Sequence, residues 1–267
     1  MKKPLYLDWI IKEEGITIEG DIPIKCYKID YNDDEKILND WALHIRRNYI
    51  NDEDLVEDTE CNNLTVEEYL TKYVIPQKDD QLGPTARSGD ITEIIISDLL
   101  EFIFGYTVTR FKMKNRLGKN TLGGGTDVIG YKYFNEDKVP SEKDIIVATE
   151  VKAQLTSSSY EPIRDSIYDS KKDEHRLART IDCCRKFFKQ YNKEQAEEIK
   201  RFLFKPDNNY KIIYASAGFS SRVNVDDNII LSTEKDKLEI RKGQKIFYIH
   251  GKKLMDLTHR VYERCKK

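Results

Sequence analysis

The chain has 267 residues, of which 34% are charged and 39% hydrophobic, and its formal net charge at pH 7 is −2. A chain of this length can bury a substantial core, and this composition is typical of a soluble globular protein with a charged surface. The nearly balanced charge excludes a basic field over the whole molecule, so any attraction to a polyanion has to come from local patches.

The five cysteines are irregularly spaced, and no two of them form a Cys-x-x-Cys pair. This pattern disfavours a zinc ribbon and is typical of reduced thiols, which indicates a cytoplasmic protein. The first eight residues, Met-Lys-Lys-Pro-Leu-Tyr-Leu-Asp, become charged too early for a signal peptide. No segment reaches the ~18 apolar residues of a membrane span, so we expect no contact with a membrane.

The N-terminal part of the chain reads as short strands followed by helices. Three strands and one helix are predicted, in this order, at residues 5–11, 16–18, 22–29 and 34–49. Thr65 and Glu68 have the spacing of a capping box, which predicts a short helix through Val74 that Pro76 ends. Residues 77–89 contain Gly-Pro and Ser-Gly pairs and are predicted as a loop.

Residues 30–60 carry eleven acidic residues against three basic ones, a local charge of −8. The simplest interpretation is a solvated surface. Two functional alternatives stay open: a docking surface for a basic partner, and an acidic screen beside a nucleic-acid groove.

From residue 90 onward the pattern predicts a mixed sheet flanked by helices, which is an α/β (α+β) fold. Strands are predicted at residues 106–113, 127–134, 145–155, 211–215 and 245–249, and helices at 90–104, 163–191, 193–203 and 254–264. Gly105 follows the first of these helices, as expected for a C-terminal cap. We therefore divide the chain into an N-terminal β/α extension, residues 1–85, and a larger domain, residues 86–267.

The strand at 145–155 has one apolar face and one face that changes character along its length. Because side chains alternate in a strand, Ile146 and Ala148 share a face with the polar residues Glu150, Lys152 and Gln154. A polar patch confined to one end of a strand indicates a site at the edge of the sheet.

Asp127 follows three glycines and precedes a second apolar strand pattern. If residues 135–144 form a hairpin between the two strands, Asp127 lies near Glu150. Two carboxylates at this distance can share Mg²⁺ or Mn²⁺, which polarises a phosphate and activates water, while Lys152 stabilises charge and Gln154 positions the phosphate. The alternative is an ordinary surface aspartate and a Glu–Lys pair.

Residues just upstream could complete such a site. On the helix at 90–104, Glu93 is positioned to serve as a further metal ligand, although Asp90 to Glu93 also fits a capping box. Arg87 and Ser88 precede the predicted start of this helix, where they could meet a phosphate or be ordinary loop residues.

The best local patch for nucleic acid lies between residues 106 and 126, where five basic residues occur without an acidic one. These residues are Arg110, Lys112, Lys114, Arg116 and Lys119. A solvated strand and loop would have the same composition. The helical stretch at 171–189 is also basic, but three acidic residues dilute it, so it ranks lower.

Asp127, Glu150-Val151-Lys152 and an upstream Glu93 together resemble the PD-(D/E)xK superfamily of restriction-endonuclease-like nucleases, over residues 87–220. The resemblance implies a central mixed sheet, with Asp127, Glu150 and Glu93 as metal ligands and Lys152 as the catalytic lysine. Thr126 stands where the motif's name has proline.

Residues 44–49 (His-Ile-Arg-Arg-Asn-Tyr) and 87–90 (Arg-Ser-Gly-Asp), with the two motif strands, resemble bacterial defence nucleases of the HamA-like type from Hachiman anti-phage systems. That resemblance implies a helicase partner.

Two functions are therefore open. The first is a Mg²⁺-dependent nuclease that acts on DNA, with no small-molecule cofactor, because no Gly-rich nucleotide-binding loop occurs. The second is a non-catalytic nucleic-acid-binding or adaptor protein on a nuclease-like fold, which would dock its partner through the acidic segment.

Overall fold

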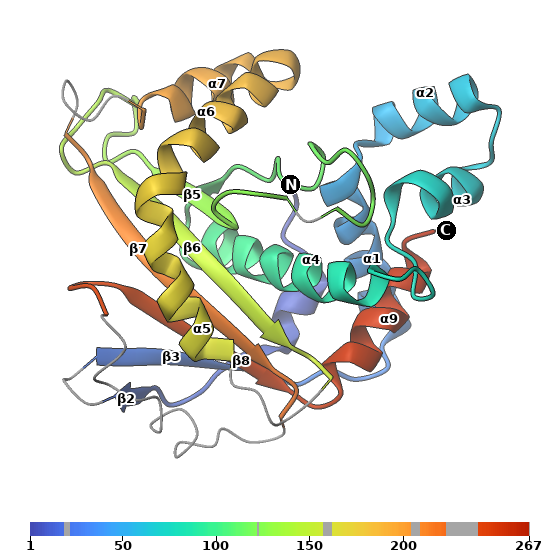
Figure 1. The fold of residues 1–267 in the computed structure, drawn as a ribbon, viewed down its shortest axis with the longest axis horizontal. Helices are drawn as coiled ribbons and strands as arrows, with labels where there is room; N and C mark the ends of the chain where they lie inside the picture. Colours follow the sequence, from blue (N-terminus) through green and yellow to red (C-terminus); the bar gives the residue numbers. More distant parts are fainter. Residues whose placement is uncertain (19–21, 122, 157–161, 204–208, 223–239, 267) are drawn as a thin grey trace.

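The structure is a computed structural model that describes residues 1–18, 22–121, 123–156, 162–203, 209–222 and 240–266. The described residues form a mixed sheet with helices on both faces, which confirms the predicted α/β (α+β) class (Figure 1). The strands lie in the order β1-β3-β8-β7-β6-β5-β4, and β2 pairs with β3. Their bounds are β1 Ile10–Lys12, β2 Ile16–Ile18, β3 Ile22–Ile29, β4 Thr107–Val108, β5 Val128–Lys132, β6 Ile145–Gln154, β7 Lys211–Ser220 and β8 Lys245–Gly251.

The middle of the sheet is parallel and its margins are antiparallel. Strands β6, β7, β8 and β3 run in one direction, whereas β5 and β4 on one side, and β1 and β2 on the other, pair antiparallel. A parallel strand is covered on both faces, so it has to be apolar throughout its central part. The first four residues of β6, Ile-Ile-Val-Ala, meet this requirement.

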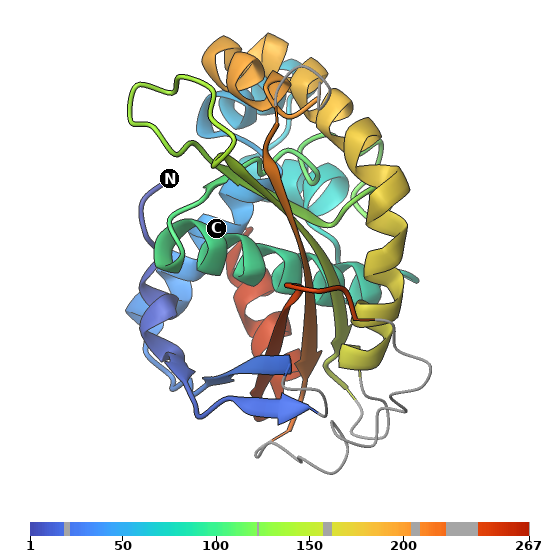
Figure 2. The same cartoon turned by 90° about the vertical axis from the view of Figure 1, so that its left-hand side faces the viewer.

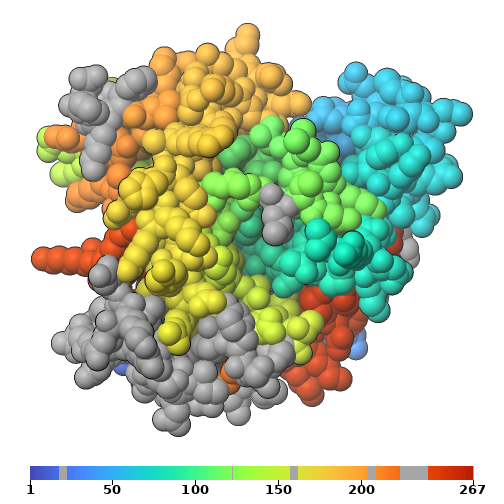
Figure 3. All heavy atoms as spheres, in the orientation of Figure 1, coloured from blue at the N-terminus to red at the C-terminus, as the bar shows by residue number. Residues whose placement is uncertain are grey.

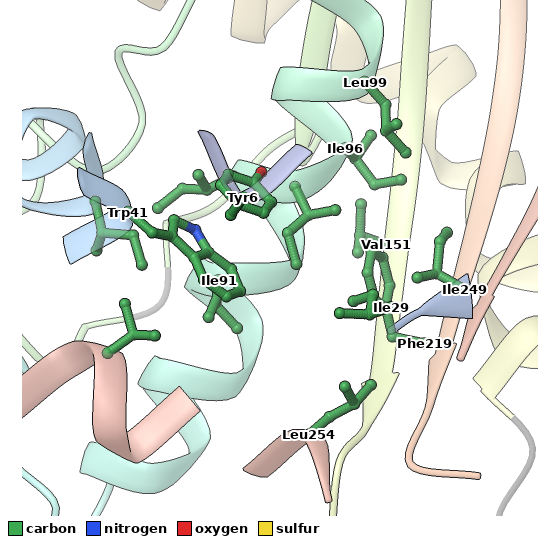
Figure 4. Packing of buried hydrophobic residues seen from close by; sticks show 14 of the residues in the cluster. Tyr6, Ile29, Trp41, Ile91, Ile96, Leu99, Val151, Phe219, Ile249 and Leu254 are labelled. Carbon is green, nitrogen blue, oxygen red and sulfur yellow. The ribbon is translucent and has the colours of Figure 1, made fainter. Parts of the chain in front are cut away.

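Two layers of helices cover the sheet, as the two orthogonal views show (Figures 1 and 2). On one face lie α1 (Glu35–Tyr49), α4 (Gly83–Asp98) and α9 (Leu254–Arg264). Figure 4 shows Ile96 and Leu99 of this layer on the side of Val151, whereas Ile91 lies beside Trp41.

On the other face lie α5 (Pro162–Asp169), α6 (Asp173–Tyr191) and α7 (Lys193–Lys200), with the 3₁₀ turn η4 (Ser170–Lys172) between the first two. Ile146 and Ala148 of β6 contact Leu177 and Ile181 of α6 in this second core. The period-two alternation of β6 therefore divides its side chains between the two cores.

The predictions for the N-terminal part are largely confirmed. Strands β2 and β3 and the helices α1 and α3 (Val66–Tyr69) form where expected, and Thr65 and Glu68 make the predicted capping box. The π-helical turn η2 (Leu70–Val74) then continues α3. The prediction of a strand from residue 5 was wrong, because the 3₁₀ helix η1 (Leu5–Trp9) precedes β1 and buries Tyr6 against Trp41.

A helix at α2 (Asp52–Asn62) was not predicted, because its acidic sequence has a weak apolar face. Figure 1 shows α2 and α3 projecting away from the sheet.

Helix α4 begins at Gly83 and not at residue 90, so the predicted loop was wrong for residues 83–89. Pro84 lies in the first turn, where its missing N–H is not needed. The helix therefore passes through Asp90, which rules out the predicted capping box there. At its other end α4 continues as the π-helical turn η3 (Leu99–Ile103), close to the predicted limit.

The predicted strand at 106–113 is reduced to β4, because residues 111–115 form turns. Strands β7 and β8 extend beyond their predicted ends, and α9 has the predicted bounds.

The predicted division at residues 85 and 86 falls inside the first turn of α4. Strand β3 of the N-terminal part pairs with β8 in the same sheet as the motif strands. The division into an N-terminal extension and a larger domain stays a prediction, and the two parts share one sheet. No helix within the described ranges is both long and apolar enough to cross a membrane.

The close approach of α5 to β7 gives a test of the fold. A Cβ at Gly218 would lie 2.7 Å from the Cα of Ile163. We expect Gly218→Ala to lower the free energy of unfolding by about 1–3 kcal/mol, because neither backbone can give way. The matched control is Gly89→Ala in α4, where nothing lies within 4 Å of the added Cβ. That variant should gain up to about 1 kcal/mol in urea unfolding, because alanine favours the helix. Equal effects of the two substitutions would contradict this packing.

Candidate active site

The predicted hairpin between the motif strands is present. Strand β5 pairs antiparallel with β6, and Val128 is opposite Thr149. Asp127 therefore lies at the end of the strand pair beside Glu150, and its Oδ2 accepts a hydrogen bond of 2.9 Å from the amide of Val151. The two carboxylates that the sequence placed together are neighbours in the folded chain.

Glu93 reaches the same place from α4. The ammonium of Lys112 donates to Glu93 Oε1 at 2.8 Å and to Asp127 Oδ1 at 2.7 Å, so one lysine joins the two carboxylates. All three side chains are largely buried. The sequence singled out Lys112 only as a contact for nucleic acid, and its position between two acids was not foreseen.

Glu150 and Lys152 form a second part of the site. Lys152 Nζ donates to Glu150 Oε1 at 2.8 Å and forms an ion pair of 2.9 Å with Asp169 of α5. Arg176 of α6 donates to Glu150 Oε2, also at 2.8 Å. The contributions of Asp169 and Arg176 were missed, because nothing in the local sequence shows which face of a later helix meets a strand.

Gln154 is the last residue of β6, and its backbone carbonyl accepts a hydrogen bond of 3.1 Å from the amide of Ser221. Its half-buried side chain lies two residues beyond Lys152 on the same face. A role in positioning a phosphate stays a prediction.

The carboxylates repel one another. Burial, Asp127 and Asp90 together raise the pKa of Glu93 to about 8, although Lys112 opposes this shift. Burial and the charge of Asp127 also raise the pKa of Glu150. Burial disfavours the charged form of Lys152, but its hydrogen bonds to Glu150 and Asp169 outweigh burial and raise the pKa of this lysine. Carboxylates with raised pKa values are typical of sites that gain from additional positive charge.

The chemistry of these side chains suits a hard divalent cation, because Glu93, Asp127 and Glu150 offer carboxylate oxygens from three elements. Within the described part of the chain, no three histidine, cysteine, aspartate or glutamate side chains are already grouped to hold a metal ion. Basic side chains instead lie against these carboxylates: Lys112 on Glu93 and Asp127, and Lys152 and Arg176 on Glu150.

Asp173, at the start of α6, is a further acid that the sequence did not indicate. It is fully buried, and one carboxylate oxygen accepts a 2.9 Å hydrogen bond from the hydroxyl of Thr126. The other oxygen is buried and has no hydrogen-bond partner among the described residues. Burial, with a contribution from Glu150, raises the pKa of Asp173 to about 7.

The predicted nucleic-acid patch at residues 110–119 is directed inward, which corrects the expectation of an exposed basic surface. Arg110 pairs with Asp98 and Glu101, and Arg116 forms a double hydrogen bond with Asp90. Lys119 pairs with Asp80 at 2.8 Å, and Lys114 donates to Asn51. The buried Asp98 and Asp90 of α4 need Arg110 and Arg116, because an unpaired charge in the interior is costly.

Arg87 and Ser88 are in the second turn of α4 and not at its N-terminus. Arg87 is fully buried and donates to the carbonyl of Pro76 at 2.7 Å and to Glu263 at 2.9 Å. The backbone carbonyl of Ser88 accepts from Thr92 within the helix. The geometry therefore gives Arg87 a structural role and does not support contact with a phosphate.

Exposed basic side chains occur along α6 instead. They are His175, Arg179, Lys186 and Lys189, together with Lys172 directly before the helix. The space-filling view shows α6 running beside the loop that leads to the candidate site, on the same face of the molecule (Figure 3). Helix α6, which the sequence placed below residues 106–126 as a surface for nucleic acid, is therefore the better exposed basic surface of the two.

Comparison with known proteins gave one family. The family model described as HamA matches residues 4–265, which is nearly the whole chain. No curated protein matches the chain.

The pair of Arg116 and Asp90 gives a test of the inward-directed loop. The two side chains are 5% and 1% exposed, so Arg116→Met would leave a buried carboxylate without its counter-ion. We expect the free energy of unfolding to fall by about 3–5 kcal/mol in urea titrations. The control is Lys186→Met, which breaks an exposed pair with Asp182 on α6 and should change stability little. Wild-type stability of Arg116→Met would mean that the loop is not anchored in this way.

Asp173 gives a prediction for pH dependence. The pKa of Asp173 is about 7 in the folded chain, above the ordinary value of 3.8. Between these two pH values the folded chain keeps a proton on Asp173 that the unfolded chain has lost. Stability therefore falls as the pH rises through this window, by up to about 1.4 kcal/mol per pH unit. Asp173→Asn should reduce this slope. Asp182→Asn, on the exposed face of α6, should keep it, because the pKa of Asp182 is already lowered by Lys186 and Arg185. Parallel curves for the wild type and Asp173→Asn would contradict the assignment.

Proposed function

The chain belongs to the HamA family, and we propose that it is a metal-dependent nuclease that hydrolyses phosphodiester bonds in DNA. The family is associated with antiviral defence. One observation carries the proposal: Glu93, Asp127, Glu150 and Lys152 meet at one end of the β5–β6 pair, although they come from separate parts of the sequence.

We assign Asp127, Glu150 and Glu93 as the residues that would hold Mg²⁺ or Mn²⁺. When bound, such an ion supplies positive charge for a phosphate and lowers the pKa of a bound water. The backbone amide of Val151 fixes the orientation of Asp127 by holding one of its oxygens, which leaves the other oxygen directed toward Glu93 and Lys112. Asp127 is thus already oriented by the sheet and needs little rearrangement.

Lys152 is assigned the role of stabilising negative charge on the phosphate. Its side chain is 31% exposed, so it is the member of the group best placed to meet a substrate. Glu150 and Asp169 hold it by two ion pairs and keep it protonated, because they raise its pKa. A lysine that stays charged acts as an electrostatic catalyst and not as a general base.

We assign the path of the DNA to the exposed basic face of α6, because the cations of residues 110–119 are engaged with internal partners. Arg179 and Lys186 of this helix, with Lys172 directly before it, lie at intervals of seven residues. Contacts from such a row would go to the phosphate backbone and would not read the base sequence. Binding of DNA should accordingly weaken as the salt concentration rises.

The acidic helix α2, together with α3, is assigned to a defence partner, which the sequence resemblance implies is a helicase. Both helices project from the body of the molecule and are available for contact (Figure 1). The second candidate function is a non-catalytic adaptor on the same fold. The adaptor function is favoured by the basic side chains that lie against Glu93, Asp127 and Glu150. A chain that never binds metal would need these cations permanently to neutralise the carboxylates.

The nuclease assay uses purified chain, alone and with its partner, on linear and circular DNA with Mg²⁺ or with EDTA. We expect cleavage with Mg²⁺ only, and a loss of at least about 100-fold in Asp127→Asn and Lys152→Ala. The control is Lys28→Ala, a strand lysine with similar exposure, 33%, that is paired with Asp30 at 3.2 Å outside the site. Equal cleavage by the wild type and both site variants would reject the nuclease. A stable complex that never cuts would favour the adaptor.

A further inference from the structure

We propose that Lys112 is an internal counter-cation of the candidate site, which a divalent metal ion must displace from Glu93 and Asp127 in order to bind. The inference rests on the proposed function, because it concerns the metal site assigned above. It gives this lysine a role other than the contact with nucleic acid that its sequence position suggested.

The first argument is position. The ammonium of Lys112 lies 2.8 Å from Glu93 Oε1 and 2.7 Å from Asp127 Oδ1. The second oxygen of Asp127 is held by the Val151 amide, so the oxygen bound to Lys112 is the one that could turn to a metal ion. Lys112 and the metal therefore compete for the same carboxylate oxygen of Asp127.

The second argument is charge. One ammonium carries a single positive charge and faces the carboxylates of both Glu93 and Asp127. Lys112 therefore cannot match both charges when the two carboxylates are ionised. A divalent ion at the same place would match both charges, so exchange of the lysine for the metal is electrostatically favourable.

The third argument is how the lysine is held. Its aliphatic stem lies against Gly123, where a Cβ would come within 2.9 Å of Lys112 Cγ. Glycine at this position thus lets the stem lie along the loop, while only the terminal ammonium makes the two ion pairs. No other hydrogen bond of the Lys112 ammonium is formed within the described residues, so its release breaks these two contacts and nothing else.

Lys152 and Arg176 do not have this arrangement, because each of them contacts Glu150 and an aspartate outside the proposed metal ligands. Lys112 alone among these three cations connects two of the proposed ligands. Displacement of Lys112 would also free a positive charge beside the metal, where a phosphate of the substrate would arrive. Lys112 is therefore a positioning residue for the metal-free site and becomes available to the substrate once the metal is bound.

The test measures metal binding and not activity. Mn²⁺ is titrated into the purified full chain by calorimetry, for the wild type and for Lys112→Gln. We expect Lys112→Gln to bind Mn²⁺ at least about tenfold more tightly, because the competing charge is gone. Its melting temperature without metal should fall, and Mn²⁺ should raise it by more than in the wild type.

The matched control is Lys138→Gln. Lys138 likewise joins two carboxylates, those of Glu194 and Glu198, but it does so on the surface and away from the site. Its substitution should leave Mn²⁺ binding unchanged. If Lys112→Gln does not fold without metal, Mn²⁺ should restore its folded circular dichroism spectrum, and a failure of this rescue would overturn the inference.

The outcomes separate the inference from the proposed function. Equal Mn²⁺ binding by the wild type and Lys112→Gln, with loss of binding in Asp127→Asn, would overturn the role of Lys112 and leave the nuclease intact. Weaker binding by Lys112→Gln would do the same. No Mn²⁺ binding by any of the three proteins would overturn both proposals.

Discussion

The need to neutralise buried carboxylates along α4 governs the arrangement of the whole site. Asp90, Glu93 and Asp98 of this helix have buried or largely buried side chains, and an uncompensated charge there would cost more than the chain's stability allows. The loop at residues 110–119 supplies a cation to each of these acids. Arg116 pairs with Asp90, Lys112 with Glu93 and Arg110 with Asp98. This pairing fixes the loop across the helix, and the loop leads directly to Asp127. The position of Asp127 is therefore tied to the ion pairs of Asp90 and Asp98, which lie on either side of Glu93 along α4.

The parts of the fold that depend on local periodicity could be predicted from the sequence. The alternation of β6 located Glu150 and Lys152 on one face, and an apolar pattern after Asp127 implied the hairpin that the structure contains. The limits of β3, α1 and α9 follow from the same kind of pattern, as does the capping box at Thr65. In each case the signal lies within about ten neighbouring residues, where backbone preference and the apolar stripe agree.

The remainder could not be predicted, because it depends on charges that meet only in the folded chain. A run of five basic residues looks the same in the sequence whether it faces solvent or a helix full of acids, and Arg110 and Arg116 face the helix. The Gly-Pro pair before α4 is equally ambiguous, since proline suits both a turn and a first helical turn. Asp169 and Asp173, from the helical stretch that follows β6, contact Lys152 and Thr126 through tertiary contacts alone. The proposed metal ligands were thus accessible to sequence reasoning, whereas the residues that balance their charge were not.

The parallel pairing of β3 with β8 bears on how the chain is synthesised. More than 200 residues separate these neighbours, whereas β5 and β6 are joined by a short connection. On the ribosome, the hairpin that carries Asp127 and Glu150 can form long before β8 emerges. Strand β3 cannot join the rest of the sheet until β8 has been made, because β8 lies between β3 and β7. A nascent or prematurely terminated chain would hold the acidic hairpin together with unpaired strand edges, the state most exposed to aggregation and to proteases. Completion of the sheet therefore marks the point at which these exposed edges are paired and the whole chain can become stable.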